Sequence, residues 1–97
     1  MKVTVKFFAT VRQVTQVAQV ELELGNSHGV TVGDVMELLA AEFGAKFKDE
    51  VLKPTGGISE NIRILLNGHF IDRKGQPLSY AISDGDTLFL FPLSAGG

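Results

Sequence analysis

One amphipathic segment near the middle of the chain most limits the folds that are open to it. Hydrophobic side chains recur there at the spacing of a helix that buries one side, at Val32, Val35, Met36, Leu39 and Phe43. Thr31 occupies the expected N-cap position, Asp34 lies in the first turn, and Gly44 is placed to end the helix. This is the one long helical pattern in the chain, so the rest of the fold must be built mainly from strands.

Segments with the alternation of half-buried strands flank this helix on both sides. In the first, Val3, Val5 and Phe7 share one face and polar residues share the other. The strands are expected at residues 2–7, 17–24, 62–66, 70–71 and 88–91. An Asn-Gly pair at 67–68 predicts a tight turn between two of them.

The segments between these elements are expected to be mostly irregular. The polar residues RQVTQ between the first two strands favour a hairpin connection with an irregular loop. Residues 45–60 form a polar stretch that contains the loop signal KPTGG. A short helical turn is expected within residues 78–82.

The order strand, strand, helix, strand, short strand, strand predicts an α+β domain. In it, a mixed sheet of four to five strands packs on one main helix. If the helix connects the first strand hairpin to the later strands, the first and last strands are adjacent and parallel, which is the β-grasp arrangement. A chain of 97 residues, 44% of them hydrophobic, is long enough for one such core. We therefore expect one domain over residues 1–93 and a flexible C-terminal diglycine tail over residues 94–97.

The composition argues against several classes of function. A net charge of −2 offers no basic surface for nucleic acid, and no apolar run approaches the roughly 20 residues of a membrane-spanning helix. The chain has no cysteine, which excludes disulfides and thiolate chemistry. His28 and His69 stand apart from further ligands, so we expect no metal site. The N-terminus lacks the apolar block of a signal peptide, and the expected location is the cytoplasm.

The last two residues, Gly96 and Gly97, are the candidate functional group. Past the final strand, residues 94–97 extend by at most on the order of 13 Å, and glycines without Cβ atoms can enter a narrow channel. The group at the expected end of this thread is the α-carboxylate of Gly97. A carboxylate must be activated before it reacts, and PTGG followed by Ile58 lacks the spacing of a phosphate-binding loop. An external enzyme is therefore required.

Several segments, taken in order, resemble the MoaD family: VKFFATVRQ, TVGDVMELL, LLNGHFI, LSYAISDGDTLFLFP and the ending AGG. Members of this family are the small sulfur-carrier subunits of molybdopterin synthase, ubiquitin-like relatives of the thiamine carrier ThiS. The resemblance covers nearly the whole chain apart from residues 45–60. It implies that a MoeB-like, ubiquitin-activating-type enzyme uses ATP to adenylate Gly97, which then becomes a thiocarboxylate. It also implies that a MoaE-like large subunit receives the sulfur in molybdenum cofactor biosynthesis, and that the chain is a consumed co-substrate, with no bound cofactor and no enzymatic site of its own.

Three aromatic residues, Phe8, Phe89 and Phe91, do not fit the inward faces of the first and last strands. With Phe7 inward in the first strand, they are expected on the outer face of the sheet, with Phe70 beside them. Clustered exposed aromatic residues mark binding surfaces. The resemblance implies that Phe8, Phe70 and Phe91 contact the large synthase subunit and the activating enzyme. The predicted partner-binding segment continues from this cluster through Pro92, Leu93, Ser94 and Ala95.

Other functions share these features and stay open. A ubiquitin-like protein modifier of the small archaeal type would join Gly97 to lysines of target proteins. A sulfur carrier for thiamine or tRNA thiolation would use the same thiocarboxylate, and FPLSAGG lacks the second proline of the frequent FPPVAGG ending. An interaction domain with an inert tail is the remaining alternative.

Overall fold

The computed structural model describes residues 1–25, 29–71 and 76–93 of the chain. Its strands lie close to the predicted segments and cover Lys2–Phe7 (β1), Gln19–Glu23 (β2), Ile62–Leu66 (β3), His69–Phe70 (β4) and Thr87–Pro92 (β5). Asn67 and Gly68 connect β3 to β4 with φ of 53° and 88°, the positive values that a type I′ turn requires. The expected short helical turn is present as a 3-10 helix at Pro77–Ser79. The predicted tail over residues 94–97 lies outside the described residues.

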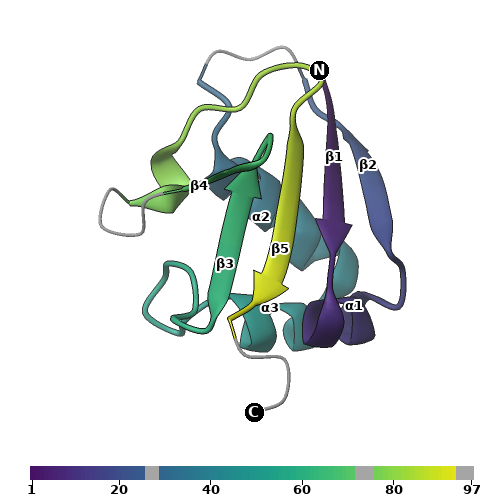
Figure 1. Ribbon diagram of the computed structural model, residues 1–97, viewed down its shortest axis with the longest axis vertical. Helices are drawn as coiled ribbons and strands as arrows, with labels where there is room; N and C mark the ends of the chain where they lie inside the picture. The colour runs from purple at the N-terminus through teal and green to yellow at the C-terminus, as the bar shows by residue number, and fades with distance from the viewer. Residues whose placement is uncertain (26–28, 72–75, 94–97) are drawn as a thin grey trace.

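The strands form one five-stranded sheet in the order β2-β1-β5-β3-β4 (Figure 1). β1 and β5 are parallel neighbours, and the remaining pairs are antiparallel. The first and last strands of the chain therefore lie side by side at the centre of a mixed sheet. This topology confirms the predicted α+β class and the β-grasp arrangement.

The main helix, α2 (Val32–Phe43), has both of its predicted ends. Thr31 Oγ1 accepts a hydrogen bond from the Asp34 backbone N–H at 3.3 Å, and the Asp34 carboxylate accepts one from the Thr31 backbone N–H at 2.9 Å. This capping box satisfies two N–H groups that the helix leaves without an internal partner. At the other end the helix stops at Gly44, whose φ of 80° a residue with a Cβ atom rarely adopts.

Two short helices accompany the one main helix α2, and the loops expected in their place are wrong. Helix α1 (Ala9–Thr15) replaces the irregular loop expected between the first two strands. Helix α3 (Ala45–Val51) occupies the start of the stretch expected to be loop at 45–60. Each has seven residues, fewer than the roughly 12 that an isolated helix needs in water, so neither is specified by its own propensity.

Tertiary contacts stabilise both short helices. Val11 of α1 and Phe47 and Val51 of α3 are fully buried. The Thr10 hydroxyl donates to the Glu50 carboxylate at 2.5 Å, which joins α1 to α3. Each segment contains only one pair of apolar residues at helical spacing, Val11 and Val14 in α1 and Phe47 and Val51 in α3, which is too short a pattern to predict a helix.

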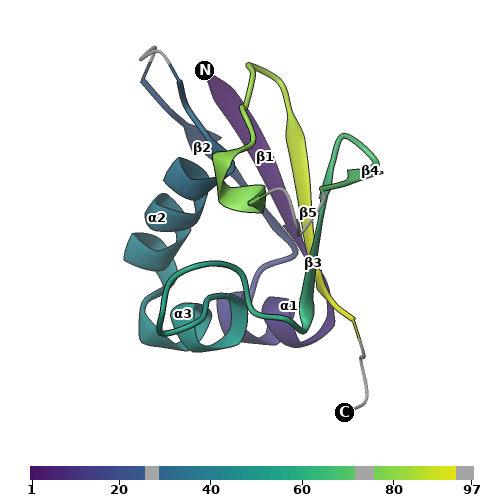
Figure 2. The same cartoon turned by 90° about the vertical axis from the view of Figure 1, so that its left-hand side faces the viewer.

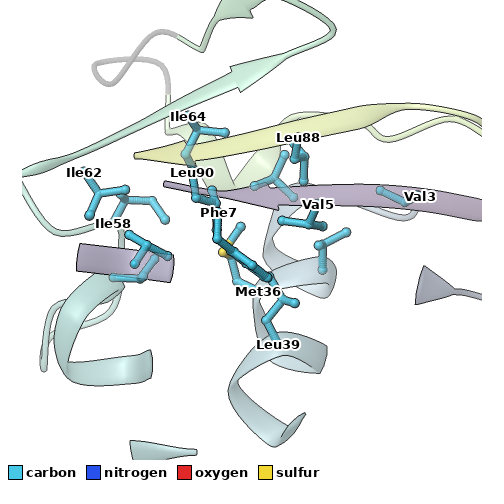
Figure 3. Close-up of a cluster of buried hydrophobic side chains, with 14 of the residues drawn as sticks. Val3, Val5, Phe7, Met36, Leu39, Ile58, Ile62, Ile64, Leu88 and Leu90 are labelled. Atoms are coloured by element: carbon cyan, nitrogen blue, oxygen red, sulfur yellow. The ribbon is translucent and has the colours of Figure 1, made fainter. Parts of the chain in front are cut away.

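All three helices lie on the same side of the sheet (Figure 2), and the core fills the space between the two layers. Inward residues of β1, β3 and β5 meet Met36 and Leu39 of α2 there (Figure 3). The ring of Phe7 makes edge contacts with Phe43 and Phe47, with centroids 5.6 and 6.4 Å apart. The opposite face of the sheet is covered by no described helix, and it carries the candidate site.

Candidate functional site

The chain turns sharply after β1, and this turn places the first predicted partner-binding residue. Phe8 keeps an extended backbone, and its N–H donates to the Leu90 carbonyl at 3.1 Å, which continues the pairing of β1 with β5. Because successive strand residues point to opposite faces, Phe8 lies across the sheet from the buried Phe7. Ala9 then adopts φ 51° and begins α1, so the strand stops directly after Phe8.

Four phenylalanines form a continuous cluster on the uncovered face, which we name the aromatic surface: Phe8, Phe70, Phe89 and Phe91. The Phe8 and Phe89 rings are stacked with centroids 6.0 Å apart, and the Phe91 centroid lies 6.4 Å from Phe8 and 6.1 Å from Phe70. Phe8 is 43% exposed and Phe70 is 67% exposed, while Phe89 and Phe91 are half-buried. Contiguous exposed aromatic carbon of this kind is typical of surfaces that a partner covers, and the partner-binding role stays a prediction.

The aromatic surface borders a shallow hollow of about 370 Å³. Its lining includes Phe8, Phe89, Phe91 and Pro92, and also two residues that the sequence did not single out, Ala9 and Leu65. Leu65 lies opposite Phe89 in the register of β3 and β5. A signal for it existed in the sequence, since Leu65 follows the inward Ile64 just as Phe8 follows Phe7.

Strand β5 leads directly from the aromatic surface to the last described residue. Pro92 is buried and pairs with Ile62, whereas Leu93 is 59% exposed. The Leu93 backbone N–H donates to the Asn61 carbonyl. This bond holds residue 93 against the start of β3, beside the hollow.

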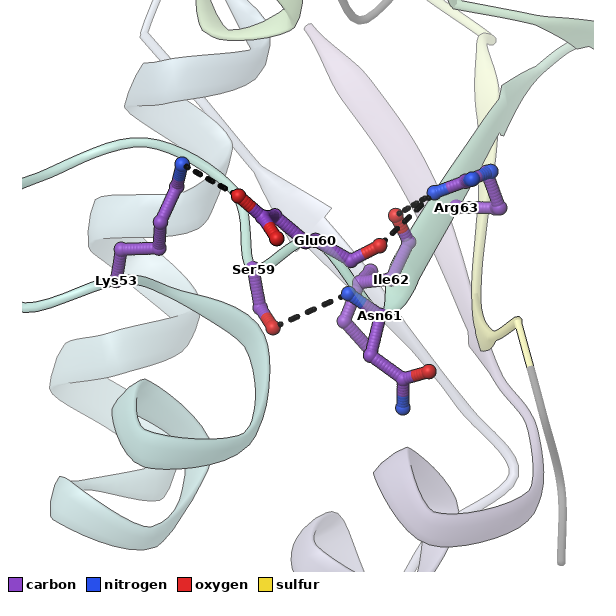
Figure 4. Close-up of polar contacts among 6 residues, drawn as sticks. All are labelled: Lys53, Ser59, Glu60, Asn61, Ile62 and Arg63. Carbon is purple, nitrogen blue, oxygen red and sulfur yellow. Dashed lines mark hydrogen bonds and ion pairs between the residues drawn. The ribbon is translucent and has the colours of Figure 1, made fainter. Parts of the chain in front are cut away.

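The loop that supplies this carbonyl is held by its own polar contacts (Figure 4). The Asn61 N–H donates to Ser59 Oγ at 3.4 Å, and Arg63 Nη1 donates to the backbone carbonyls of Glu60 and Ile62 at 3.1 and 3.3 Å. Lys53 Nζ also lies 3.9 Å from the Glu60 carboxylate, an exposed pair that adds little stability. The carbonyl that anchors Leu93 therefore sits in a well-connected loop.

The other predicted site residues, Ser94, Ala95, Gly96 and Gly97, lie outside the described residues, as does His28. His69 is exposed in β4. Within ranges 1–25, 29–71 and 76–93, no three or more His, Cys, Asp or Glu side chains are grouped to hold a metal ion. Across these same ranges, the helices are too short or too polar to span a membrane.

Comparison with known proteins gives matches along the whole chain. Residues 5–97 match the ThiS family. Small archaeal modifier protein 3 of Haloferax volcanii is 33% identical over 101 residues, covering 100% of both chains. Among solved structures, SAMP1 from Haloferax volcanii has a TM-score of 0.83 at 27% identity, covering 100% of both chains. A putative molybdopterin converting factor, subunit 1, from Pyrococcus furiosus has a TM-score of 0.73 at 32% identity, covering 97% of this chain and 99% of that one.

Proposed function

Because the chain belongs to the ThiS family of ubiquitin-like carriers and modifiers, we propose that its reactive group is the carboxylate of Gly97 and that the aromatic surface is where an activating enzyme holds it. One spatial observation carries this proposal. The strand that bears Phe89 and Phe91 is also the strand that leads toward Gly97. A partner seated on the aromatic surface is then within reach of the reactive end, since four further residues span at most on the order of 13 Å.

The chain and its partner enzyme supply different groups for the activation reaction. A Gly97 carboxylate oxygen attacks the α-phosphate of ATP in a MoeB-like, ubiquitin-activating-type enzyme, and pyrophosphate leaves. The resulting acyl-adenylate has AMP as a good leaving group, and a nucleophile displaces it at the Gly97 carbonyl. The chain supplies the acyl group and the docking surface, and the partner supplies the nucleotide site. Docking raises the effective concentration of the tail at that site.

In the first branch of this proposal the nucleophile that displaces AMP is hydrosulfide, or sulfur at the same oxidation level delivered by a donor. The product is a Gly97 thiocarboxylate, which a MoaE-like large subunit uses to insert sulfur during molybdopterin synthesis. The 32% identity to a putative molybdopterin converting factor subunit supports this branch. The protein is then a recharged co-substrate of the synthase.

In the second branch the nucleophile is the ε-amine of a lysine on a target protein, and Gly97 becomes part of an isopeptide bond. The 33% identity to a small archaeal modifier protein over its full length supports this branch equally well. The two branches share the tail, the adenylate and the aromatic surface, and they separate only after activation.

Intact mass spectrometry of the protein isolated from its own cells distinguishes the branches. Exchange of one oxygen for sulfur at the C-terminus identifies the carrier. An isopeptide-linked C-terminal fragment of this chain on lysines of other proteins identifies the modifier, and trypsin leaves residues 75–97 as that fragment because Lys74 is the last basic residue. Finding only the free carboxylate, in cells that contain an active partner enzyme, would argue against both.

Deletion of Gly97 tests the shared step, and we expect it to abolish adenylation by the purified activating enzyme while the thermal unfolding curve stays unchanged. Lys46→Ala in α3 is the control, because it lies outside the predicted partner-binding residues and keeps the complete tail, and it should be charged at the wild-type rate. If the Gly97-deleted chain is still adenylated at its C-terminus, the assignment of Gly97 is wrong.

A further inference from the structure

The sheet face that bears the aromatic surface has a charge pattern of its own. Strands β1, β3, β4 and β5 contain the cations Lys2, Lys6 and Arg63 and no carboxylate, although the whole chain has a net charge of −2. The carboxylates of the sheet, Glu21 and Glu23, lie on the edge strand β2. Cations are therefore concentrated on the strands that carry the phenylalanines.

Of the two lysines on β1, the one beside the aromatic surface lacks a charged neighbour across the strand pair. Lys2 lies opposite Glu23 in the β1–β2 register, whereas Lys6 lies opposite the neutral Gln19. Lys6 Nζ is 5.5 Å from the centroid of the Phe89 ring, within the range of a cation–π contact. The charge of Lys6 is thus held at the β1 side of the aromatic surface.

Arg63 holds a second cation on the opposite side of β5. It lies across from Phe91 in the register of β3 and β5, and it is half-buried. Among the described residues, its hydrogen-bond acceptors are the backbone carbonyls of Glu60 and Ile62, both bound through Nη1 (Figure 4). These bonds orient the guanidinium group without neutralising it, and within the described part of the chain no acceptor binds its Nε or Nη2 donors.

We propose that Lys6 and Arg63 form a cationic rim on two sides of the aromatic surface, and that the protein partner seated there presents carboxylates to them around an apolar centre. This proposal rests on the proposed function, because it assumes that the activating enzyme covers the aromatic surface. The aromatic rings supply most of the affinity, while the rim accelerates association and selects the docking orientation. Two cations on a chain of net charge −2 neutralise too few phosphates to favour a nucleic acid at this face.

The test measures ATP–pyrophosphate exchange by the cognate ubiquitin-activating-type enzyme at increasing concentrations of this chain. The double variant Lys6→Glu/Arg63→Glu should raise KM on the order of tenfold at low salt, with kcat nearly unchanged, because the rim acts on encounter and not on the chemical step. The difference in KM from wild type should shrink as salt is added. The matched control is Lys46→Glu/Lys48→Glu, which makes the same charge change at two exposed residues of α3 and should keep the wild-type KM.

The variant Phe91→Ala, measured in the same assay, separates this proposal from the proposed function. If Phe91→Ala raises KM while the rim variant behaves like the α3 control, the rim proposal is overturned and the aromatic surface stands. If the α3 control raises KM as much as the rim variant does, net charge explains the effect and the rim proposal is again overturned. If neither Phe91→Ala nor the rim variant changes KM, the docking surface of the proposed function is itself wrong. Thermal unfolding of each variant verifies that the fold is intact.

Discussion

Two adjacent residues, Phe7 and Phe8, show how differently the two faces of this sheet are used. Phe7 is 1% exposed and packs edge-on against Phe43 and Phe47, under the helices. Phe8 is 43% exposed and stacks on Phe89 on the uncovered face. The two side chains are chemically identical, and only the alternation of the strand directs one into the core and the other outward.

Aromatic residues in this chain therefore have two separable roles. On the covered face they fill a closed core, so their loss leaves a cavity and lowers the free energy of unfolding. On the uncovered face they contact one another and stay partly accessible, so their loss should change partner affinity more than stability. Substitutions on the two faces can therefore test whether the division holds.

The largest expected effect is that of Phe7→Ala on stability. Removing this fully buried ring should lower the free energy of unfolding by about 3–5 kcal/mol, because the cavity cannot be refilled by residues held in the sheet and helices. Urea unfolding followed by circular dichroism measures it, and Phe7→Leu should show a smaller loss if the full truncation fails to fold. A loss from Phe7→Ala no greater than that from Phe8→Ala would show that the two faces do not differ in their contribution to stability.

The next effect is that of Phe91→Ala and Phe8→Ala on partner binding. Each should weaken the activating enzyme's affinity by about 2 kcal/mol, roughly thirtyfold, as a central aromatic contact typically does. Each should cost only about 1 kcal/mol of stability, mainly from lost ring contacts. Titration calorimetry and urea unfolding on the same samples give the two quantities. Equal losses in stability and in binding would mean that the uncovered face is a second core, not a docking surface.

The smallest expected effect is that of the N-cap of α2, on the helical side of the sheet. Thr31→Ala removes the side-chain half of the capping box of α2 and should lower the free energy of unfolding by about 1 kcal/mol. Partner affinity should stay unchanged, because α2 lies behind the sheet from the aromatic surface. Thr31→Ser, which keeps the hydroxyl, is the control and should restore most of the stability. A drop in affinity for Thr31→Ala with no loss of stability would contradict the separation of the two faces.

Much of this architecture could be predicted from local patterns. The capping residues and the apolar spacing specified α2, the Asn-Gly pair specified the β3–β4 turn, and strict alternation specified β1. The same alternation predicted that Phe8, Phe89 and Phe91 share the outer face. Each of these signals lies within a few neighbouring residues, where backbone geometry and side-chain period act directly.

Local sequence patterns are thus enough to predict the main helix, the strands and the face of the sheet to which each phenylalanine of β1 and β5 points. The helices at residues 9–15 and 45–51, by contrast, depend on tertiary packing, since their stability comes from buried contacts such as those of Val11 and Phe47. The position of Arg63 across from Phe91, and the place of Leu65 in the lining of the hollow, likewise depend on how the strands pair. The register between two strands and the packing of a short helix both depend on contacts between residues far apart in sequence. A pattern among neighbouring residues therefore cannot predict them.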